Sequence, residues 1–208
     1  MSQGKEKILQ TALQEFAEKG YDGARIDHIS KIAGVNKALI YYHFKSKEEL
    51  FTAVINDLFE QAASVSIEPT GASVRENLAQ VVEHFIDFLH RNPYFVRIMD
   101  QSVAQDRDIF QQLHHQNIFF ETVMGMYLLG VQTGECRKVD HPEDFVVSLL
   151  GAVYFYFSHH KAVRKFYGNI SEEEIISIRK KTMRDMISRL IFYDPKESSI
   201  NEFGHFVP

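Results

Sequence analysis

The sequence predicts an all-α protein of about nine helices, in which an N-terminal three-helix head with a helix-turn-helix precedes a larger C-terminal helical bundle. Apolar residues recur at intervals of three or four along most of the chain, few segments alternate as strands do, and only five prolines are present. With 208 residues, of which 45% are hydrophobic, the chain is long enough to bury a core of its own.

The first two helices are expected at residues 5–19 and 26–33. Apolar residues with helical spacing form a stripe in each, and Gly20 follows the end of the first. Gly34 ends the second helix, because glycine readily takes the positive φ that closes a helix.

A third helix is expected at residues 37–44, after Asn36, which is a favoured N-cap residue. Ile40 and Phe44 fall on one face of this helix. Ser46 then begins a capping-box pattern, which starts a fourth helix that we expect to end near Ser64. Two short helices joined by a glycine-containing turn cross steeply, which leaves the second free to enter a DNA major groove.

The later helices are expected to form the bundle, and capping residues, prolines and glycines mark their ends. They are expected at residues 73–91, 94–99, 108–134, 142–165 and 171–193. We therefore predict a DNA-binding domain at residues 1–46, a ligand-sensing and dimerisation domain at residues 47–193, and a C-terminal tail at residues 194–208. The fourth helix is expected to be the single link between the DNA-binding domain, called the reading head below, and the ligand-sensing part of the chain.

The expected DNA-facing residues lie in and just after the third helix. A helix in the major groove needs small or polar side chains near its N-terminus, and donors that reach phosphates. The candidates are Lys37, Ala38, Tyr41, Tyr42, His43, Lys45 and Lys47. Residues 1–50 carry eight Lys and Arg against seven Asp and Glu, whereas the whole chain has a net charge of −5. In the alternative interpretation, the two tyrosines pack on the first helix and the lysines are only solvated.

Four motifs within residues 16–50 together resemble the N-terminal pattern of the TetR family of one-component transcriptional repressors. That pattern contains F-x-x-x-G, I-A-x-x-A-G-V-S, L/I-Y-x-H/Y-F and K-x-K-x-x-L, which correspond here to residues 16–20, 29–36, 40–44 and 45–50. The resemblance implies a dimer of all-α subunits, a ligand cavity in the C-terminal part, and release of a DNA operator when a small molecule binds.

Two positions depart from the family pattern. Arg25 stands where the family usually has a capping Thr or Ser, and we interpret it as a phosphate contact instead. Leu39 stands where a Ser or Thr commonly contacts DNA, which suggests either contact with a thymine methyl group or no base contact. Both residues join the candidate DNA-facing set.

The C-terminal part is rich in aromatic residues, since 21 of the 26 in the chain follow residue 50. Aromatic and methionine side chains suit an adaptable apolar pocket, although a phenylalanine-rich core is the alternative interpretation. The candidates for binding a hydrophobic or aromatic small-molecule effector are Phe85, Phe88, Phe95, Met99, Phe119, Phe120, Met124, Tyr127 and Tyr154.

A homodimer is expected to form through the last two long helices. Residues 145–157 are apolar on nearly every side of their helix, and the final helix carries an apolar stripe. A symmetric pair would place two reading heads on a pseudo-palindromic operator. The candidates are Phe145, Leu149, Ala152, Tyr156, Ile175, Met183, Met186, Ile187 and Leu190. The alternative is that both helices serve only the core of one chain.

Other function classes have weaker support. A metal-sensing regulator is disfavoured because the histidines at 114–115 and 159–160 are adjacent and point to different helix faces. A helix-turn-helix dimer that senses no small molecule stays open. The chain has no glycine-rich phosphate loop, nucleophile elbow or H-E-x-x-H motif, so we expect neither an enzyme nor a cofactor.

A cytoplasmic protein without a membrane anchor is expected. Cys136 is the only cysteine, which excludes an intrachain disulfide, and the chain opens without the pattern of a secretory signal. The longest uncharged apolar run, residues 145–158, has 14 residues and is too short to span a bilayer.

Overall fold

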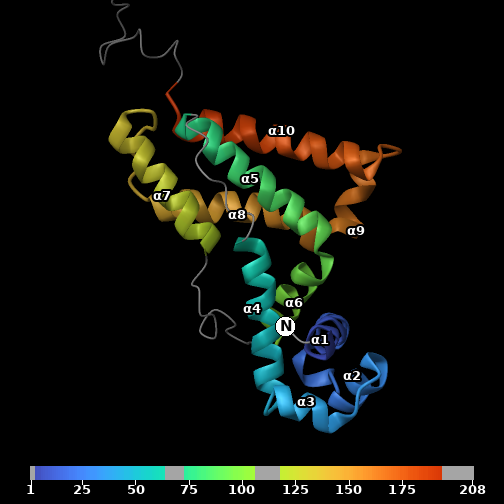
Figure 1. Ribbon diagram of the computed structural model, residues 1–208. Helices are drawn as coiled ribbons and strands as arrows, with labels where there is room; N and C mark the ends of the chain where they lie inside the picture. Colours follow the sequence, from blue (N-terminus) through green and yellow to red (C-terminus); the bar gives the residue numbers. More distant parts are fainter. Residues whose placement is uncertain (1–2, 64–72, 106–117, 194–208) are drawn as a thin grey trace, which may run out of the picture. The chain divides into compact units, whose positions relative to one another are not determined.

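The predicted all-α fold is confirmed, because the described part of the chain forms ten α-helices and a short 3₁₀ helix without a regular strand. The computed structural model describes residues 3–63, 73–105 and 118–193. Its helices are α1 (Gln3–Gly23), α2 (Ile26–Ala33), α3 (Lys37–His43), α4 (Lys47–Ala63), α5 (Val74–Arg91), α6 (Pro93–Ala104), α7 (Ile118–Thr133), α8 (Pro142–Ser158), α9 (His160–Val163) and α10 (Glu172–Ile191), with η2 (Arg164–Tyr167) before the last (Figure 1).

Chain contacts divide the protein into two compact units. The first contains α1–α4 and α6, and the second contains α5 and α7–α10. The predicted boundary at residue 46 therefore lies inside the first unit. As a division of function it stays a prediction.

The helix ends differ from the sequence expectation at three places. Gly20 takes a φ of 68° and interrupts α1, but one more turn follows it. The helix α6 extends beyond the predicted residue 99 to Ala104. The predicted helix at residues 142–165 breaks after Ser158, and Arg164 donates hydrogen bonds to the carbonyl oxygens of Gly168 and Ile170, which closes the turn into α10. The first residues of the helix predicted at 108–134, and the tail, lie outside the described residues.

In the first unit, α6 packs on α1 in addition to α4 and the two helices of the motif. The Phe16 ring meets Phe51 of α4 edge to face, with 5.0 Å between ring centroids. At the end of α6, the Gln105 side chain accepts a hydrogen bond of 3.0 Å from the backbone N–H of Tyr21. The expectation that the fourth helix alone reaches the head is therefore wrong, because tertiary packing also brings α6 against α1.

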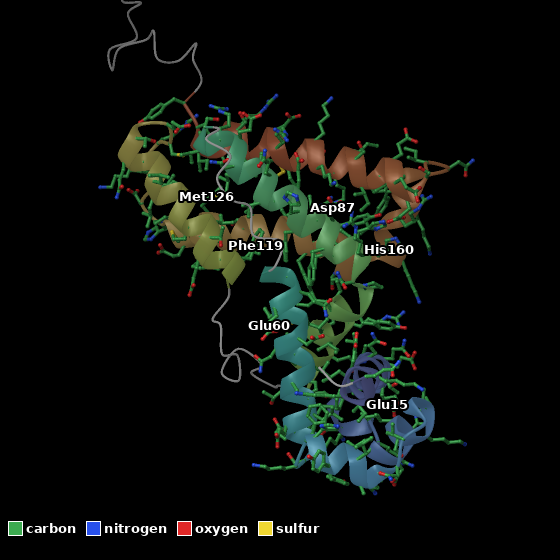
Figure 2. All side chains as sticks on the ribbon, in the orientation of Figure 1. Glu15, Glu60, Asp87, Phe119, Met126 and His160 are labelled. Atoms are coloured by element: carbon green, nitrogen blue, oxygen red, sulfur yellow. The ribbon has the colours of Figure 1, made fainter. Side chains whose placement is uncertain are left out.

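In the second unit, ion pairs tie α5 to α10. Lys180 lies 2.7 Å from Asp87, and the Arg184 Nε donates to Glu83 at 2.9 Å; Asp87 is labelled in Figure 2. The helix α10 is also tied to α8, since Arg179 donates to the Ala152 carbonyl oxygen at 2.6 Å. These contacts hold α8 and α10 together as neighbours.

The connection from α7 to α8 is closed by buried groups. Cys136 forms an isolated backbone bridge with Phe192, and its side chain is buried. Burial raises the pKa of the Cys136 thiol to about 11, so the thiol is protonated at neutral pH.

Within the described ranges, no helix is both long and apolar enough to cross a bilayer.

Glu172, in the first turn of α10, accepts hydrogen bonds from Tyr156 at 2.9 Å and from His160 at 3.2 Å. Burial by itself would raise the pKa of Glu172, but these donors outweigh it, so the pKa lies below the ordinary value of 4.5. A lowered folded-state pKa means that ionised Glu172 stabilises the fold above pH 4.5, and that this stabilisation is lost as the pH falls through the lowered pKa.

We therefore expect Glu172→Gln to lower the free energy of unfolding by about 1–2 kcal/mol at neutral pH, because an ionised acceptor is lost. The difference from wild type should shrink as the pH falls below 4.5 and through the lowered pKa of Glu172, where the native carboxyl also protonates. Denaturant unfolding across this pH range measures it. Glu173→Gln, at an exposed position of the same turn, is the control for the helix dipole; an equal effect at both positions would contradict the assignment.

Candidate nucleic-acid interface

The turn between α2 and α3 has the local structure that the sequence predicts. Gly34 takes φ 66° and ψ 32°, and the N–H of Val35 reaches back to the Ser30 carbonyl at 3.0 Å. Asn36 caps α3, since its side chain accepts a 2.7 Å hydrogen bond from the Leu39 N–H. Residues of the turn itself therefore fix the end of α2 and the start of α3.

The helix α3 buries one side and exposes the rest. Ile40 and Phe44 are buried in the head, whereas Tyr41 is 43% exposed and Tyr42 is 83% exposed. In α2, by contrast, Ile32 is exposed although it belongs to the apolar set of that helix. The outward side of α3 therefore carries side chains that the core of the first unit does not need.

Most of the predicted DNA-facing residues are exposed. Arg25, Lys37, Ala38, Tyr41, Tyr42 and Lys45 are exposed, and Leu39, His43 and Lys47 are half-buried. The alternative in which the tyrosines pack on the first helix is therefore wrong for Tyr42, which is almost fully exposed. As DNA contacts, all nine stay predictions.

Lys37 and Lys47 both have partners inside the head. Lys37 lies 2.7 Å from Asp27, an exposed ion pair that raises the pKa of the lysine. Lys47 lies over the Tyr21 ring, 4.6 Å from its centroid, and donates to the Asp22 carbonyl oxygen at 3.3 Å. A change at Lys47 would disturb the last turn of α1 as well as any phosphate contact, so it is a poor test of DNA binding.

Two cations that the sequence interpretation did not select lie beside the motif. The Lys7 Nζ approaches Gly34, 3.6 Å from where a Cβ would stand there. The Lys5 Nζ lies 5.7 Å from the centre of the Phe44 ring. Both belong to the first turns of α1, where their spacing resembled an ordinary solvated helix face.

The candidate effector residues divide between the two units. Phe95 and Met99 belong to the first unit, where Phe95 is buried and packs on Phe59 of α4. The other seven belong to the second unit. Of these, Phe88 and Tyr127 are buried, and Phe85, Phe119, Phe120, Met124 and Tyr154 are half-buried.

Tyr127 is better explained as a structural residue than as an effector contact. Its hydroxyl donates to the Arg137 carbonyl oxygen at 3.2 Å and accepts from the Val139 N–H at 2.9 Å. Both bonds hold the α7–α8 connection. The Tyr127 hydroxyl therefore already has a hydrogen-bond donor and an acceptor, which argues against Tyr127 as an effector contact.

The candidate dimer residues also divide into two groups. Leu149, Tyr156, Ile175, Met183 and Ile187 are buried inside the chain, Phe145 and Ala152 are half-buried, and Met186 and Leu190 are exposed. The five buried residues are corrected to core positions, because side chains already covered by their own chain offer little surface to a second copy. The exposed apolar residues of the same helices are their neighbours Val147, Phe155 and Ile178.

The candidate histidine pairs do not come together as a metal site in the described residues. No group of three or more His, Cys, Asp or Glu side chains with the arrangement of a metal site occurs there. His160 instead contacts Glu172. His114 and His115 lie outside the described residues.

Two family models match the sequence. The model described as "Bacterial regulatory proteins, tetR family" matches residues 8–54, and the model described as "Tetracyclin repressor-like, C-terminal domain" matches residues 75–187. Together they span the head and the second unit.

Three curated relatives are transcriptional regulators. The HTH-type transcriptional repressor NicS of Pseudomonas putida is 33% identical over 97 residues, which are 46% of each chain. The biofilm operon icaADBC negative transcriptional regulator IcaR of Staphylococcus epidermidis is 35% identical over 88 residues, 42% of this chain and 35% of IcaR. The HTH-type transcriptional regulator YerO of Bacillus subtilis is 25% identical over 91% of this chain and 66% of its own length. The chain thus matches less than two thirds of the length of each of these relatives.

Solved structures share the fold. A transcriptional regulator from Streptomyces coelicolor aligns with a TM-score of 0.71 and 16% identity over 89% of this chain and 97% of that chain. A TetR-family regulator from Rhodococcus sp. aligns with a TM-score of 0.67 and 21% identity over 91% of this chain and 99% of that chain. Because the C-terminal family model alone covers more than half of the sequence, and the N-terminal model covers the helix-turn-helix, the chain belongs to the TetR family of bacterial regulatory proteins.

Proposed function

We propose that the protein is a ligand-responsive DNA-binding transcriptional regulator. It acts as a homodimeric repressor, which a mostly apolar small molecule releases from a pseudo-palindromic operator. The observation that carries the proposal is that one side of α3 faces solvent. Ile40 and Phe44 are buried, whereas the side chains of Lys37, Ala38 and Tyr42 are exposed and can contact a major groove. Repression is favoured over activation because NicS is a repressor and IcaR a negative regulator.

Tyr42→Ala and Lys37→Ala test the DNA-binding surface. Each should weaken binding to a duplex that the wild-type protein selects from a random-sequence pool by about tenfold, and Lys37→Ala should also reduce the salt dependence by about one unit of slope. Fluorescence anisotropy at several salt concentrations measures both. Tyr42 is exposed, and the ion pair of Lys37 with Asp27 is an exposed one that contributes little stability, so the melting temperature should change little.

Lys161→Ala, which removes an exposed lysine from α9, is the charge-matched control. It should leave affinity and salt slope at the wild-type values. Wild-type affinity in both head variants would reject the surface.

The dimer is proposed to form through exposed apolar stripes on α8 and α10. On α8, Val147, Gly151 and Phe155 are exposed at intervals of four residues. On α10, Ile178, Met186 and Leu190 follow the same spacing around the exposed Thr182. Residues four apart share a helix face, and the hydrogen bond from Arg179 to Ala152 joins α8 to α10, which supports the proposal that the two stripes act together as one surface. A second copy related by a twofold axis can cover it with the same surface.

The effector is proposed to bind among the half-buried aromatic side chains of the second unit. Phe119 of α7, labelled in Figure 2, lies 4.1 Å from Phe85 of α5, centroid to centroid. A pair of rings that is partly accessible and joins two helices can take up an apolar molecule against its exposed side, which a fully buried pair cannot. The effector class is therefore hydrophobic or aromatic.

A compound screen tests sensing independently of DNA binding. A hydrophobic aromatic compound that raises the melting temperature of the wild-type protein should weaken its affinity for the selected duplex, by reciprocal linkage. Phe119→Ala should reduce the thermal shift and keep DNA binding. If the stabilising compounds leave duplex affinity unchanged, a helix-turn-helix dimer without small-molecule sensing becomes the better description.

A further inference from the structure

Glu15 is a buried carboxylate that the helix-turn-helix pattern does not explain. It lies on α1 beside α2 (Figure 2), and its side chain is only 3% exposed. Burying a carboxylate is costly unless hydrogen bonds and opposite charges replace the lost water. Its partners therefore indicate what it does.

Three donors from two helices converge on Glu15. Its Oε1 accepts from the Lys19 Nζ at 3.0 Å and from the backbone N–H of Arg25 at 3.3 Å, and its Oε2 lies 2.7 Å from the His28 Nδ1. Burial by itself would raise the pKa of Glu15, but these hydrogen bonds outweigh it and lower the pKa. Glu15 is thus ionised at neutral pH and can only accept, so the His28 Nδ1 donates.

The contact with Arg25 lies at the start of α2. Arg25 is the N-cap of that helix, with φ −127° and ψ 126°, and its side chain makes no capping hydrogen bond. In a capping box, a carboxylate from within the helix accepts the N–H of the N-cap residue. Here the carboxylate comes from α1 instead. Its negative charge also suits the positive end of the α2 dipole.

We propose that Glu15 is a positioning residue of the reading head, which substitutes for the missing N-cap side chain of α2 and thereby holds Arg25 as a contact to a DNA backbone phosphate. The proposal rests on the proposed DNA-binding function.

The Arg25 guanidinium is available for that role. Arg25 is exposed, and within the described ranges its side chain forms neither a hydrogen bond nor an ion pair. Fixing its backbone from α1 lowers the entropy lost when the side chain engages a phosphate, because fewer dihedral angles remain to be ordered. A capping Thr or Ser at this position could not reach a phosphate with a positive charge.

Glu15→Met tests the proposal, because methionine keeps the side-chain volume and removes both acceptors. We expect about tenfold weaker binding to a fluorescein-labelled duplex selected by the wild-type protein, and a loss of about one unit of salt slope, as for Arg25→Ala. The double variant that combines Glu15→Met with Arg25→Ala should bind the duplex no more weakly than Arg25→Ala alone, since both changes remove the same contact. Glu15→Gln, which keeps one acceptor for the Arg25 N–H, should restore most of the affinity.

Lys19→Met is the matched control, because it removes the ion pair with Glu15 and leaves the Arg25 contact. It should lower the melting temperature but keep the salt slope. All affinities are measured below the melting temperature, where a role in stability alone changes neither affinity nor slope. If Glu15→Met does not fold, Glu15→Asp, which keeps the charge but is one methylene too short, carries the same test.

Wild-type affinity and slope in Glu15→Met, or a wild-type slope in Arg25→Ala, would overturn this inference while leaving the proposed function standing. Failure of the wild-type protein to select any duplex would overturn the proposed function. Hydrogen exchange tests the positioning role of Glu15 without DNA. The amides of His28 and Ile29 donate to the Arg25 carbonyl oxygen at 3.0 Å, and they should exchange faster in Glu15→Met than in Lys19→Met. Equal exchange rates in the two variants would reject the positioning role.

Discussion

Phe155→Glu is expected to convert the dimer into monomers. Phe155 is exposed and belongs to the proposed dimer surface of α8 and α10, so a twofold interface would bury two like charges close together without partners. A cost of about 4 kcal/mol raises the dimer dissociation constant by about a thousandfold. Sedimentation velocity across a concentration series measures this shift.

Operator binding should fall with dimerisation. A single reading head contacts one half-site, so the specific affinity of Phe155→Glu should drop toward the nonspecific range, at about micromolar concentrations or weaker. Phe166→Glu is the matched control, because Phe166 of η2 is also exposed but lies outside the two stripes. A dimeric Phe155→Glu protein would show that the interface lies elsewhere on the molecule.

Gly130→Ala is expected to destabilise the second unit by about 1–3 kcal/mol, which corresponds to a fall in melting temperature of about 3–10 °C. Gly130 lies inside α7, and a Cβ at this position would overlap the Cys136 Sγ and lie 3.1 Å from the Val74 Cγ1. The short Cys136 side chain has no flexible end that could move aside. Differential scanning calorimetry gives the effect directly.

Two further variants separate this overlap from a general effect of alanine in α7. Gly125→Ala, in the same helix with nothing within 4 Å of its Cβ, should be neutral or stabilising, because alanine favours helix more than glycine does. Cys136→Ala in the Gly130→Ala background should recover part of the stability by removing the overlapping sulfur. A Gly130→Ala protein as stable as wild type would mean that the backbone of α7 shifts at little cost.

The helix-turn-helix could be predicted almost residue by residue because its signals are local. Gly34, Asn36 and the spacing of Ile40 and Phe44 act within a few residues of one another, and the structure reproduces each. The all-α class followed from the same periodicity. The order of the C-terminal helices follows from the same periodicity, whereas their ends depend on contacts such as those of Arg164 with the turn before α10.

Which face of each C-terminal helix turns outward could not be predicted. The helix α8 is apolar nearly all round, so Leu149 and Phe155 look equivalent in the sequence, yet one is buried and the other exposed. Periodicity distinguishes an apolar face from a polar one, but it cannot choose between two apolar faces. For the same reason, the sequence does not distinguish Tyr127 from an effector contact, although its hydroxyl hydrogen-bonds to the α7–α8 connection.

The sequence by itself determined the helical class, the reading motif and the family, because these depend on caps, turns and spacing within short segments. Only the tertiary structure decided that α6 joins α4 on α1, that Phe155 and Leu190 are exposed whereas Leu149 and Ile187 are buried, and that Glu15 accepts the Arg25 N–H at the start of α2. Each of these depends on contacts between segments that are distant in the chain. Their geometry is set by how whole helices pack, which no local pattern of residues specifies.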